Sequence, residues 1–273
     1  MPTTERRQRP RGRFHPLEDL LFGALHTIAR HAHNFYTALG IFLVAGATIA
    51  ILGTWGFVEL AQYVRAGGTQ RFDDAVLTWL GAHRIPWIER SLLEITALGT
   101  GLVVLMVVAV AALFLALTEH RYSAFLLLFA TPGGIALNGV LKLVFHRPRP
   151  QIIAWGMHVT TSSFPSGHAM SAMIVYATIA FLAARLEKRR WERWLTLIVA
   201  SGIIMLVALS RLYLGVHYPS DVVAGLIIGL AWAGFCLAGL EAVRVFALRF
   251  RPSELKHERD LERHERSAAG FDP

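Results

Sequence analysis

Six ionisable residues in this 273-residue sequence lie at the ends of long apolar stretches, where charged side chains are costly and are functional candidates. They are Lys142, Arg149, His168, Arg211, His217 and Asp221. The three cations could together neutralise a multiply charged anion, and the fork of an arginine guanidinium matches phosphate oxygens in a bidentate way. Sulfate or carboxylate would also fit, but the charge count favours phosphate.

Ser166 and Gly167 precede His168 at the point where a helix is expected to begin. The free backbone N–H groups at a helix N-terminus bind anions, and glycine lets a phosphate approach closely because it has no side chain. We therefore expect these two residues to complete a phosphate-binding site with the three cations.

The two histidines could divide the chemistry of phosphoryl transfer. His217 precedes Pro219, a residue typical of the first helical turn, so Asp221 lies in that turn, four residues after the histidine. A carboxylate there can accept a hydrogen bond from one ring nitrogen, which leaves the lone pair of the other nitrogen for phosphorus. His168 could then protonate the leaving oxygen and later take a proton from water.

Each of these residues, taken singly, could have a more ordinary role. An interfacial histidine can bond to the backbone, and an arginine can extend to lipid phosphates. Two histidines and one carboxylate could also suggest a metal site, but three neighbouring cations would repel a divalent ion, so we expect no metal and no cofactor. A transporter of anionic lipids could use the same basic cluster, although it would not need His217 and Asp221 at that spacing.

The spacing of these residues defines three motifs, at residues 142–150 (KLVFHRPRP), 165–168 (PSGH) and 210–221 (SRLYLGVHYPSD). In order and spacing they resemble the three signature motifs of the type 2 phosphatidic acid phosphatase family, and all eleven defining positions match. The resemblance implies a metal-independent phosphatase that works through a phosphohistidine. His217 is then the nucleophile, Asp221 its orienting partner and His168 the acid.

The resemblance also implies which residues bind phosphate. They are Lys142, Arg149, Ser166, Gly167 and Arg211. His146 and Arg147 lie at variable positions of the first motif, so we expect them to be only accessory.

Apolar helices long enough to cross a bilayer must position these motifs. The sequence is 54% hydrophobic and 17% charged, with a mean hydropathy of +0.46, which excludes an ordinary soluble domain of about 25% charged residues. The expected crossings are residues 37–60, 95–117, 122–140, 169–184, 194–209 and 222–240. The predicted fold is an all-α polytopic membrane protein, a six-transmembrane-helix bundle. Six crossings also disfavour a vanadate-dependent haloperoxidase-like enzyme, whose soluble members share the three motifs.

The basic residues predict the orientation of the bundle. Of the 27 Lys and Arg residues, 19 fall in the two tails and the segments on the same side, and 8 fall in the three loops opposite. Both termini are therefore predicted to be cytoplasmic, with the site on the periplasmic or extracellular face of the cell (inner) membrane. The net charge of +8 is attributed to arginines that face anionic lipid, and no nucleic-acid partner is expected.

The flanking regions complete the domain organisation. Residues 1–36 are predicted to form a basic segment with an amphipathic helix over 17–28, either at the interface or packed on the bundle; residues 37–240 are the predicted membrane phosphatase domain and residues 241–273 a charged cytoplasmic tail. Residues 71–94 predict short amphipathic helices on the outer surface, broken near Pro86. The single cysteine, Cys236, excludes an intramolecular disulfide.

A phosphate site at a bilayer surface suits an amphiphile whose head lies at the interface. The expected substrate is therefore a lipid phosphate or diphosphate. For bacteria-like members of the family this means undecaprenyl diphosphate, phosphatidic acid, phosphatidylglycerol phosphate or diacylglycerol diphosphate. No sequence feature chooses among them.

Overall fold

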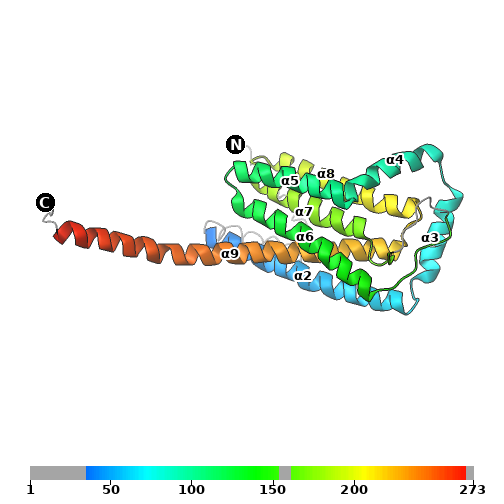
Figure 1. The fold of residues 1–273 in the computed structure, drawn as a ribbon, viewed down its shortest axis with the longest axis horizontal. Coiled ribbons are helices and arrows are strands. Elements are labelled where there is room, and N and C mark those ends of the chain that lie inside the picture. Colours follow the sequence, from blue (N-terminus) through cyan, green and yellow to red (C-terminus); the bar gives the residue numbers. More distant parts are fainter. Residues whose placement is uncertain (1–34, 154–160, 269–273) are drawn as a thin grey trace, which may run out of the picture. The chain divides into compact units, whose positions relative to one another are not determined.

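The computed structural model describes residues 35–153 and 161–268, and within these ranges every regular element is a helix (Figure 1). The predicted all-α class is therefore confirmed. In chain order the elements are α2 (Phe35–Arg65), α3 (Gln70–Ala82), α4 (Pro86–Thr96), the short 3-10 helix η1 (Ala97–Gly99), α5 (Gly101–Leu117), α6 (Arg121–Val144), α7 (Gly167–Leu186), α8 (Arg190–Tyr213) and α9 (Pro219–Ala268).

Five of the described helices are long and apolar enough to cross a membrane. They lie at Gly40–Arg65, Arg121–Val144, Gly167–Leu186, Arg190–Tyr213 and Pro219–Val243. A sixth crossing is obtained when the bent pair Pro86–Gly99 and Gly101–Leu117 is counted as one span. The predicted bundle of six crossings agrees with this arrangement.

The second crossing differs from the expectation of one continuous apolar helix over residues 95–117. The chain bends by 54° between Gly99 and Gly101. The cause lies at Thr100, which takes an extended conformation as the N-cap of α5, while its hydroxyl donates to the carbonyl oxygen of Ala97 at 2.7 Å. An extended N-cap residue begins a new helix, so α4 and α5 cannot share one axis.

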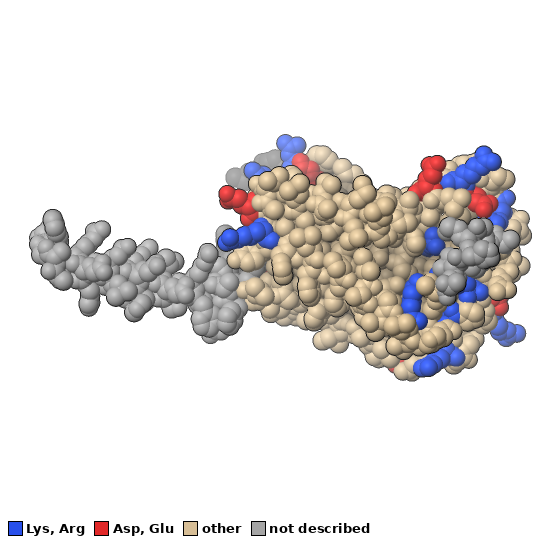
Figure 2. All heavy atoms as spheres, viewed as in Figure 1, with Lys and Arg blue, Asp and Glu red and all other residues tan. Residues whose placement is uncertain are grey.

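The surface of the described bundle carries a wide band of uncharged side chains, with Lys, Arg, Asp and Glu gathered at its two ends (Figure 2). Large apolar side chains are exposed along this band, as on α5, where Leu102, Val110 and Leu117 are at least 70% exposed. Such a continuous apolar surface is far larger than water-soluble proteins carry, so it belongs against lipid. The protein is a membrane protein.

Helix α7 forms the centre of the bundle and packs against α5, α6, α8 and α9. Its contact with α9 is unusually close because α9 has glycines there. A Cβ atom on Gly225 would lie 2.6 Å from the carbonyl oxygen of Ser166, and one on Gly229 would lie 2.9 Å from that of Met170. Small residues let helix backbones approach in this way. The contact brings the N-terminal ends of α7 and α9 together.

Helix α3 lies in the connection after the first crossing, and α4, with Pro86 in its first turn, begins the bent second crossing. The predicted helices broken near Pro86 are present, and their place on the outer surface stays a prediction. Helix α3 turns Asp73 and Leu77 inwards, and both are fully buried. Phe72 and Trp79 lie on its exposed side.

The expected amphipathic helix over residues 17–28 lies outside the described residues. At the other end, α9 runs without a break to Ala268, so no loop separates the last crossing from the tail. The division into three domains stays a prediction. All predicted site residues lie within one compact unit, Phe42–Pro273.

Candidate active site

The three motifs meet at one end of the bundle. The first comes from the end of α6 and the loop after it, the second from the N-terminus of α7, and the third from the end of α8 and the loop that leads into α9. The backbone N–H of Ser166 donates to the carbonyl oxygen of Asp221 at 3.0 Å, which joins the second motif to the third. Arg149 reaches His217, which joins the first motif to the third.

His217 is 2% exposed and has a different partner at each ring nitrogen. Its Nε2 lies 3.4 Å from Nη1 of Arg149, and its Nδ1 lies 3.4 Å from Oγ of Ser163. Arginine can only donate, so Nε2 must accept and the ring proton belongs on Nδ1. Burial lowers the pKa of His217 to about 4, although Asp221 acts to raise it. The ring is therefore neutral at pH 7, with the Nε2 lone pair towards the cations.

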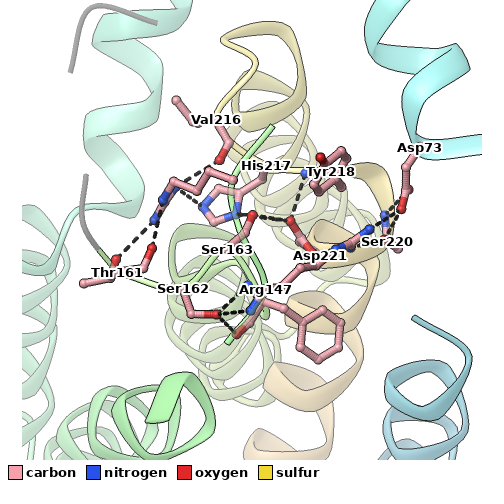
Figure 3. A network of polar contacts seen from close by, with 12 residues as sticks. Asp73, Arg147, Thr161, Ser162, Ser163, Val216, His217, Tyr218, Ser220 and Asp221 are labelled. Atoms are coloured by element: carbon pink, nitrogen blue, oxygen red, sulfur yellow. Dashed lines mark hydrogen bonds and ion pairs between the residues drawn. The ribbon is translucent and has the colours of Figure 1, made fainter. Parts of the chain in front are cut away.

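Asp221 reaches the imidazole through an intermediate hydroxyl (Figure 3). Its Oδ2 lies 3.7 Å from His217 Nδ1, too far for a direct hydrogen bond. Instead Ser163 Oγ donates to this Oδ2 at 2.5 Å and is positioned to accept from the ring. The backbone N–H of Tyr218 also donates to Oδ2, at 2.9 Å, as an acidic third residue of a helix often caps its own N-terminus. The expected direct contact is thus replaced by a serine bridge.

The cations are held by neutral partners that leave part of their charge available. Arg149 donates from Nη1 to the carbonyl oxygen of Val216 at 2.9 Å and from Nε to that of Thr161 at 3.1 Å. Arg211 is 4% exposed and donates from Nη1 to Oγ1 of Thr96 at 2.8 Å. Lys142 lies within electrostatic reach of both arginines.

Several polar atoms of the site lack partners within the described ranges, 35–153 and 161–268. Nε of Arg211 and Oγ of Ser166 are buried there without a hydrogen bond. The ring of His168 and the ammonium of Lys142 likewise make no hydrogen bond to described residues. A buried polar group without a partner costs about 1–3 kcal/mol, so Nε of Arg211 and Oγ of Ser166 are candidates to bind a ligand.

His168 stands at the start of α7, half-buried, within electrostatic reach of His217 and of all three cations. Gly99, at the bend of the second crossing, lies directly against it: a Cβ atom there would be 3.1 Å from Cβ of His168. A Cβ on Gly167 would be 3.0 Å from Oδ1 of Asn138, so a larger residue at 167 would crowd this side chain of α6. The backbone N–H of Ser166 is occupied by Asp221, so it is not among the free groups expected at this helix N-terminus.

Arg147 has a larger part than the accessory one expected for it. Its Nη1 donates to Oδ1 of Asp221 at 2.6 Å, and its Nη2 donates to Oδ2 of Asp73 at 2.8 Å. Burial lowers the pKa of Arg147, but Asp221 and Asp73 raise it by more, so the net shift is upward. Ser163 and Asp73 were missed altogether. Ser163 lies just before the PSGH motif and could have been suspected from that place, whereas Asp73 has no sequence signal.

The described residues contain no group of three or more His, Cys, Asp or Glu side chains that could hold a metal ion. The groups available to a ligand are imidazole, guanidinium, ammonium and hydroxyl, which together suit a phosphate.

Comparisons with known proteins agree with this geometry. The family model of the PAP2 superfamily matches residues 123–244, which include all three motifs. Phosphatidylglycerophosphatase B of Bacillus subtilis is 33% identical over 175 residues, covering 64% of this chain and 86% of the relative. The chain belongs to the PAP2 superfamily. The resemblance drawn from the motifs is therefore confirmed, and the protein is a phosphatase of the membrane branch.

Two further matches extend the comparison. The undecaprenyl-diphosphatase of Sulfolobus acidocaldarius is 30% identical over 140 residues, covering 50% of this chain and 63% of the relative. The crystal structure of a transmembrane PAP2 type phosphatidylglycerolphosphate phosphatase from Bacillus subtilis matches with a TM-score of 0.66 at 30% identity, over 71% of this chain and 96% of that chain. The similarity therefore covers most of the membrane bundle.

Proposed function

We propose that this PAP2 protein hydrolyses a lipid phosphate or diphosphate through a phosphohistidine on His217, without a metal ion. The candidate substrates are of the phosphatidylglycerol phosphate, undecaprenyl diphosphate and phosphatidic acid types. The names of the relatives support the first two, and the apolar surface of the bundle supports a substrate whose tail stays in lipid.

One observation carries the proposal. The accepting nitrogen of the neutral, buried His217 faces Arg149, while Arg211 and Ser166 hold buried polar atoms without partners in the described part of the chain. A phosphate placed among these residues would give each of those atoms an oxygen to bind, and phosphorus would lie next to a nitrogen lone pair.

The reaction follows from the roles of the two histidines. Nε2 of His217 attacks phosphorus, the bond from phosphorus to the leaving oxygen breaks, and His168, in its protonated form, gives that oxygen its proton. The resulting phosphoimidazolium keeps its Nδ1 proton, which Ser163 and Asp221 stabilise. His168, now neutral, takes a proton from water as the water oxygen attacks phosphorus. The P–N bond breaks, phosphate leaves and both histidines return to their starting states.

The cations and the serine act on the transferring group. Charge on the equatorial oxygens would be stabilised by Lys142, Arg149 and Arg211. Ser166 and Gly167 border the same space, the serine as a hydrogen-bond donor and the glycine by leaving room. No step requires a metal ion.

The site would open on the outer face of the cytoplasmic membrane, with both termini in the cytoplasm. The excess of basic residues on the opposite side of the bundle, 19 against 8, supports this orientation.

The test is a phosphate-release assay on the detergent-solubilised protein with four substrates: phosphatidylglycerol phosphate, undecaprenyl diphosphate, phosphatidic acid and a water-soluble phosphate ester. We expect release from a lipid substrate that persists in excess EDTA, and a loss of about 1,000-fold or more in His217→Ala because the nucleophile is gone. The matched control is His146→Ala, which removes an exposed histidine of the first motif that makes no contact with His217.

Turnover by His217→Ala close to that of the unmodified protein would contradict the nucleophile assignment. Binding of the lipids without any phosphate release would favour the anionic-lipid transporter instead. The ratios among the four substrates would define the substrate class.

A further inference from the structure

Asp73 is a fully buried carboxylate on α3, outside the three motifs and outside the membrane crossings. A buried charge is costly unless it is paired and hydrogen-bonded. The helix that carries it is otherwise peripheral, with Phe72 and Trp79 more than 60% exposed. The burial of the Asp73 carboxylate therefore requires an explanation from its partners.

The partners of Asp73 all belong to the active-site end of the bundle. Its Oδ1 accepts from the backbone N–H of Ser220 at 3.0 Å, and its Oδ2 accepts from the hydroxyl of Ser220 at 2.6 Å. The same Oδ2 accepts from Nη2 of Arg147 at 2.8 Å. Ser220 lies in the first turn of α9, directly before Asp221.

Arg147 connects this carboxylate to that of Asp221, as the row of contacts on the right of Figure 3 shows. One guanidinium edge holds Asp73 at 2.8 Å and Asp221 at 2.6 Å, while its plane stacks over the ring of Tyr218, 4.2 Å from the centroid. A guanidinium held by two carboxylates and one aromatic face has little freedom to move.

This arrangement divides the two oxygens of Asp221 between separate tasks. Oδ1 accepts a hydrogen bond from Arg147, whereas Oδ2 accepts one from Ser163, which contacts the His217 ring. Without Asp73, the full positive charge of Arg147 would act on Asp221 alone and compete with the imidazolium for the same carboxylate. Asp73 shares that charge and fixes the position from which it acts.

We infer that Asp73 is a positioning residue for the phosphatase reaction: through Arg147 it fixes Asp221 and thereby the ring of His217. The inference rests on the proposed function, in which His217 attacks phosphorus. It assigns to the peripheral helix α3 a part in catalysis, in addition to its place in the connection between two crossings.

The test compares Asp73→Asn with Asp74→Asn on the same helix. The asparagine keeps the size of Asp73 and one acceptor oxygen, for the backbone N–H of Ser220, but removes the charged oxygen that faces Arg147. Asp74 bonds to Gln70 at 2.8 Å and makes no contact with Arg147, so Asp74→Asn removes a neighbouring carboxylate as a matched control. Each variant is assayed on phosphatidylglycerol phosphate in detergent for kcat, KM and thermal unfolding.

We expect kcat of Asp73→Asn to fall by about 10- to 100-fold, since a small displacement of a reacting group costs rates of this order. KM should stay within about 2-fold, because Asp73 does not touch the phosphate site, and Asp74→Asn should keep both constants. Asp73→Glu, which restores a carboxylate, should regain part of the lost kcat. The effects of Asp73→Asn and Arg147→Met should be strongly non-additive in the double variant, because both act through Asp221.

A purely structural role predicts a different pattern. An Asp73→Asn variant that is less heat-stable but has normal kcat where it is folded would overturn the inference, and so would fully additive losses in the double variant. These failures are distinct from a failure of the proposed function. If the unmodified protein releases phosphate and His217→Ala does not, a normal kcat in Asp73→Asn removes only the role of Asp73.

Discussion

The two halves of the active site are built in opposite ways. On the nucleophile side, His217, Ser163, Asp221 and Arg147 bind one another, so their polar groups have partners within the protein. On the phosphate side, Ser166 and Arg211 keep buried polar atoms without partners in the described residues. The first half is complete within the protein, whereas the second, under the proposed function, would complete its hydrogen bonds with phosphate oxygens.

The two halves also rely on different supporting elements. The nucleophile side is held from α3 and from the loop that follows α6. The phosphate side is held from the bend in the second crossing, where Thr96 binds Arg211 and Gly99 lies against His168. The bend of 54° is thus a working part of the site, and variants at Thr96 and Gly99 can disturb one half while the other stays intact.

Among variants of the supporting elements, the largest effect is expected from filling the space at Gly99. A Cβ atom there would lie 2.7 Å from Cγ1 of Val207 and 3.1 Å from Cβ of His168, so Gly99→Val must push against both side chains, and we expect it to displace the histidine as well as Val207. We expect kcat to fall by about 100-fold, because the proton donor would no longer reach the leaving oxygen. Phosphate release under saturating substrate measures the change.

The control for this variant is Gly101→Val, two residues further along the chain. No atom lies within 4 Å of a Cβ at that position, so normal activity is expected. Equal losses in both variants would show that the bend as a whole, and not the contact with His168, is what the substitutions disturb.

A smaller effect is expected from Thr96→Val, which keeps the shape of the side chain and removes its hydroxyl. Arg211 would lose the acceptor 2.8 Å from its Nη1, and the guanidinium would be less well placed for phosphate. One lost hydrogen bond of about 1 kcal/mol corresponds to a rise in KM of about 5-fold. Thr96→Ser should restore KM. A rise in KM that serine does not reverse would contradict the role of the hydroxyl.

The smallest effect concerns the pH dependence of the reaction and tests the protonation of His217. Protonation of His217 removes the lone pair of Nε2. Because burial lowers the pKa of His217 to about 4, kcat/KM should begin to fall on the acid side only well below pH 6.5. Titration of His217 should therefore change kcat/KM by less than about 2-fold between pH 7 and pH 6. In Arg149→Gln, which removes one of the charges that lower this pKa, the acid limb should move to higher pH. An acid limb at pH 6.5 that does not move would contradict the assignment to His217.

Much of the phosphate side could be predicted from the sequence because it lies in contiguous motifs. The order and spacing of 142–150, 165–168 and 210–221 indicated the residues, and the apolar stretches indicated the crossings that bring them together. The bend was not predicted because residues 95–117 contain no charged residue and are mostly apolar, and hydropathy does not detect an extended N-cap such as Thr100. A Thr–Gly pair inside an apolar run was the one available sign.

The supporting contacts of the nucleophile side could not be predicted. Asp73 and Asp221 are 148 positions apart, and only the packing of α3 over the start of α9 brings them to the same guanidinium. On α3 alone, Asp73 looks like any polar residue of an amphipathic helix. The bridge through Ser163 depends on a difference between 2.5 Å and 3.7 Å at one carboxylate oxygen, which spacing along the chain does not encode.

The glycines of α9 have a consequence for how the enzyme works within a fluid bilayer. Gly225 places α9 against the backbone of α7 next to Ser166, so the helix that follows His217 and the helix that carries His168 meet main chain to main chain. A gap set by backbone contact does not depend on flexible side chains. We therefore expect the spacing of the two histidines to respond little to changes in membrane thickness or lipid composition that act on the outer surface of the bundle.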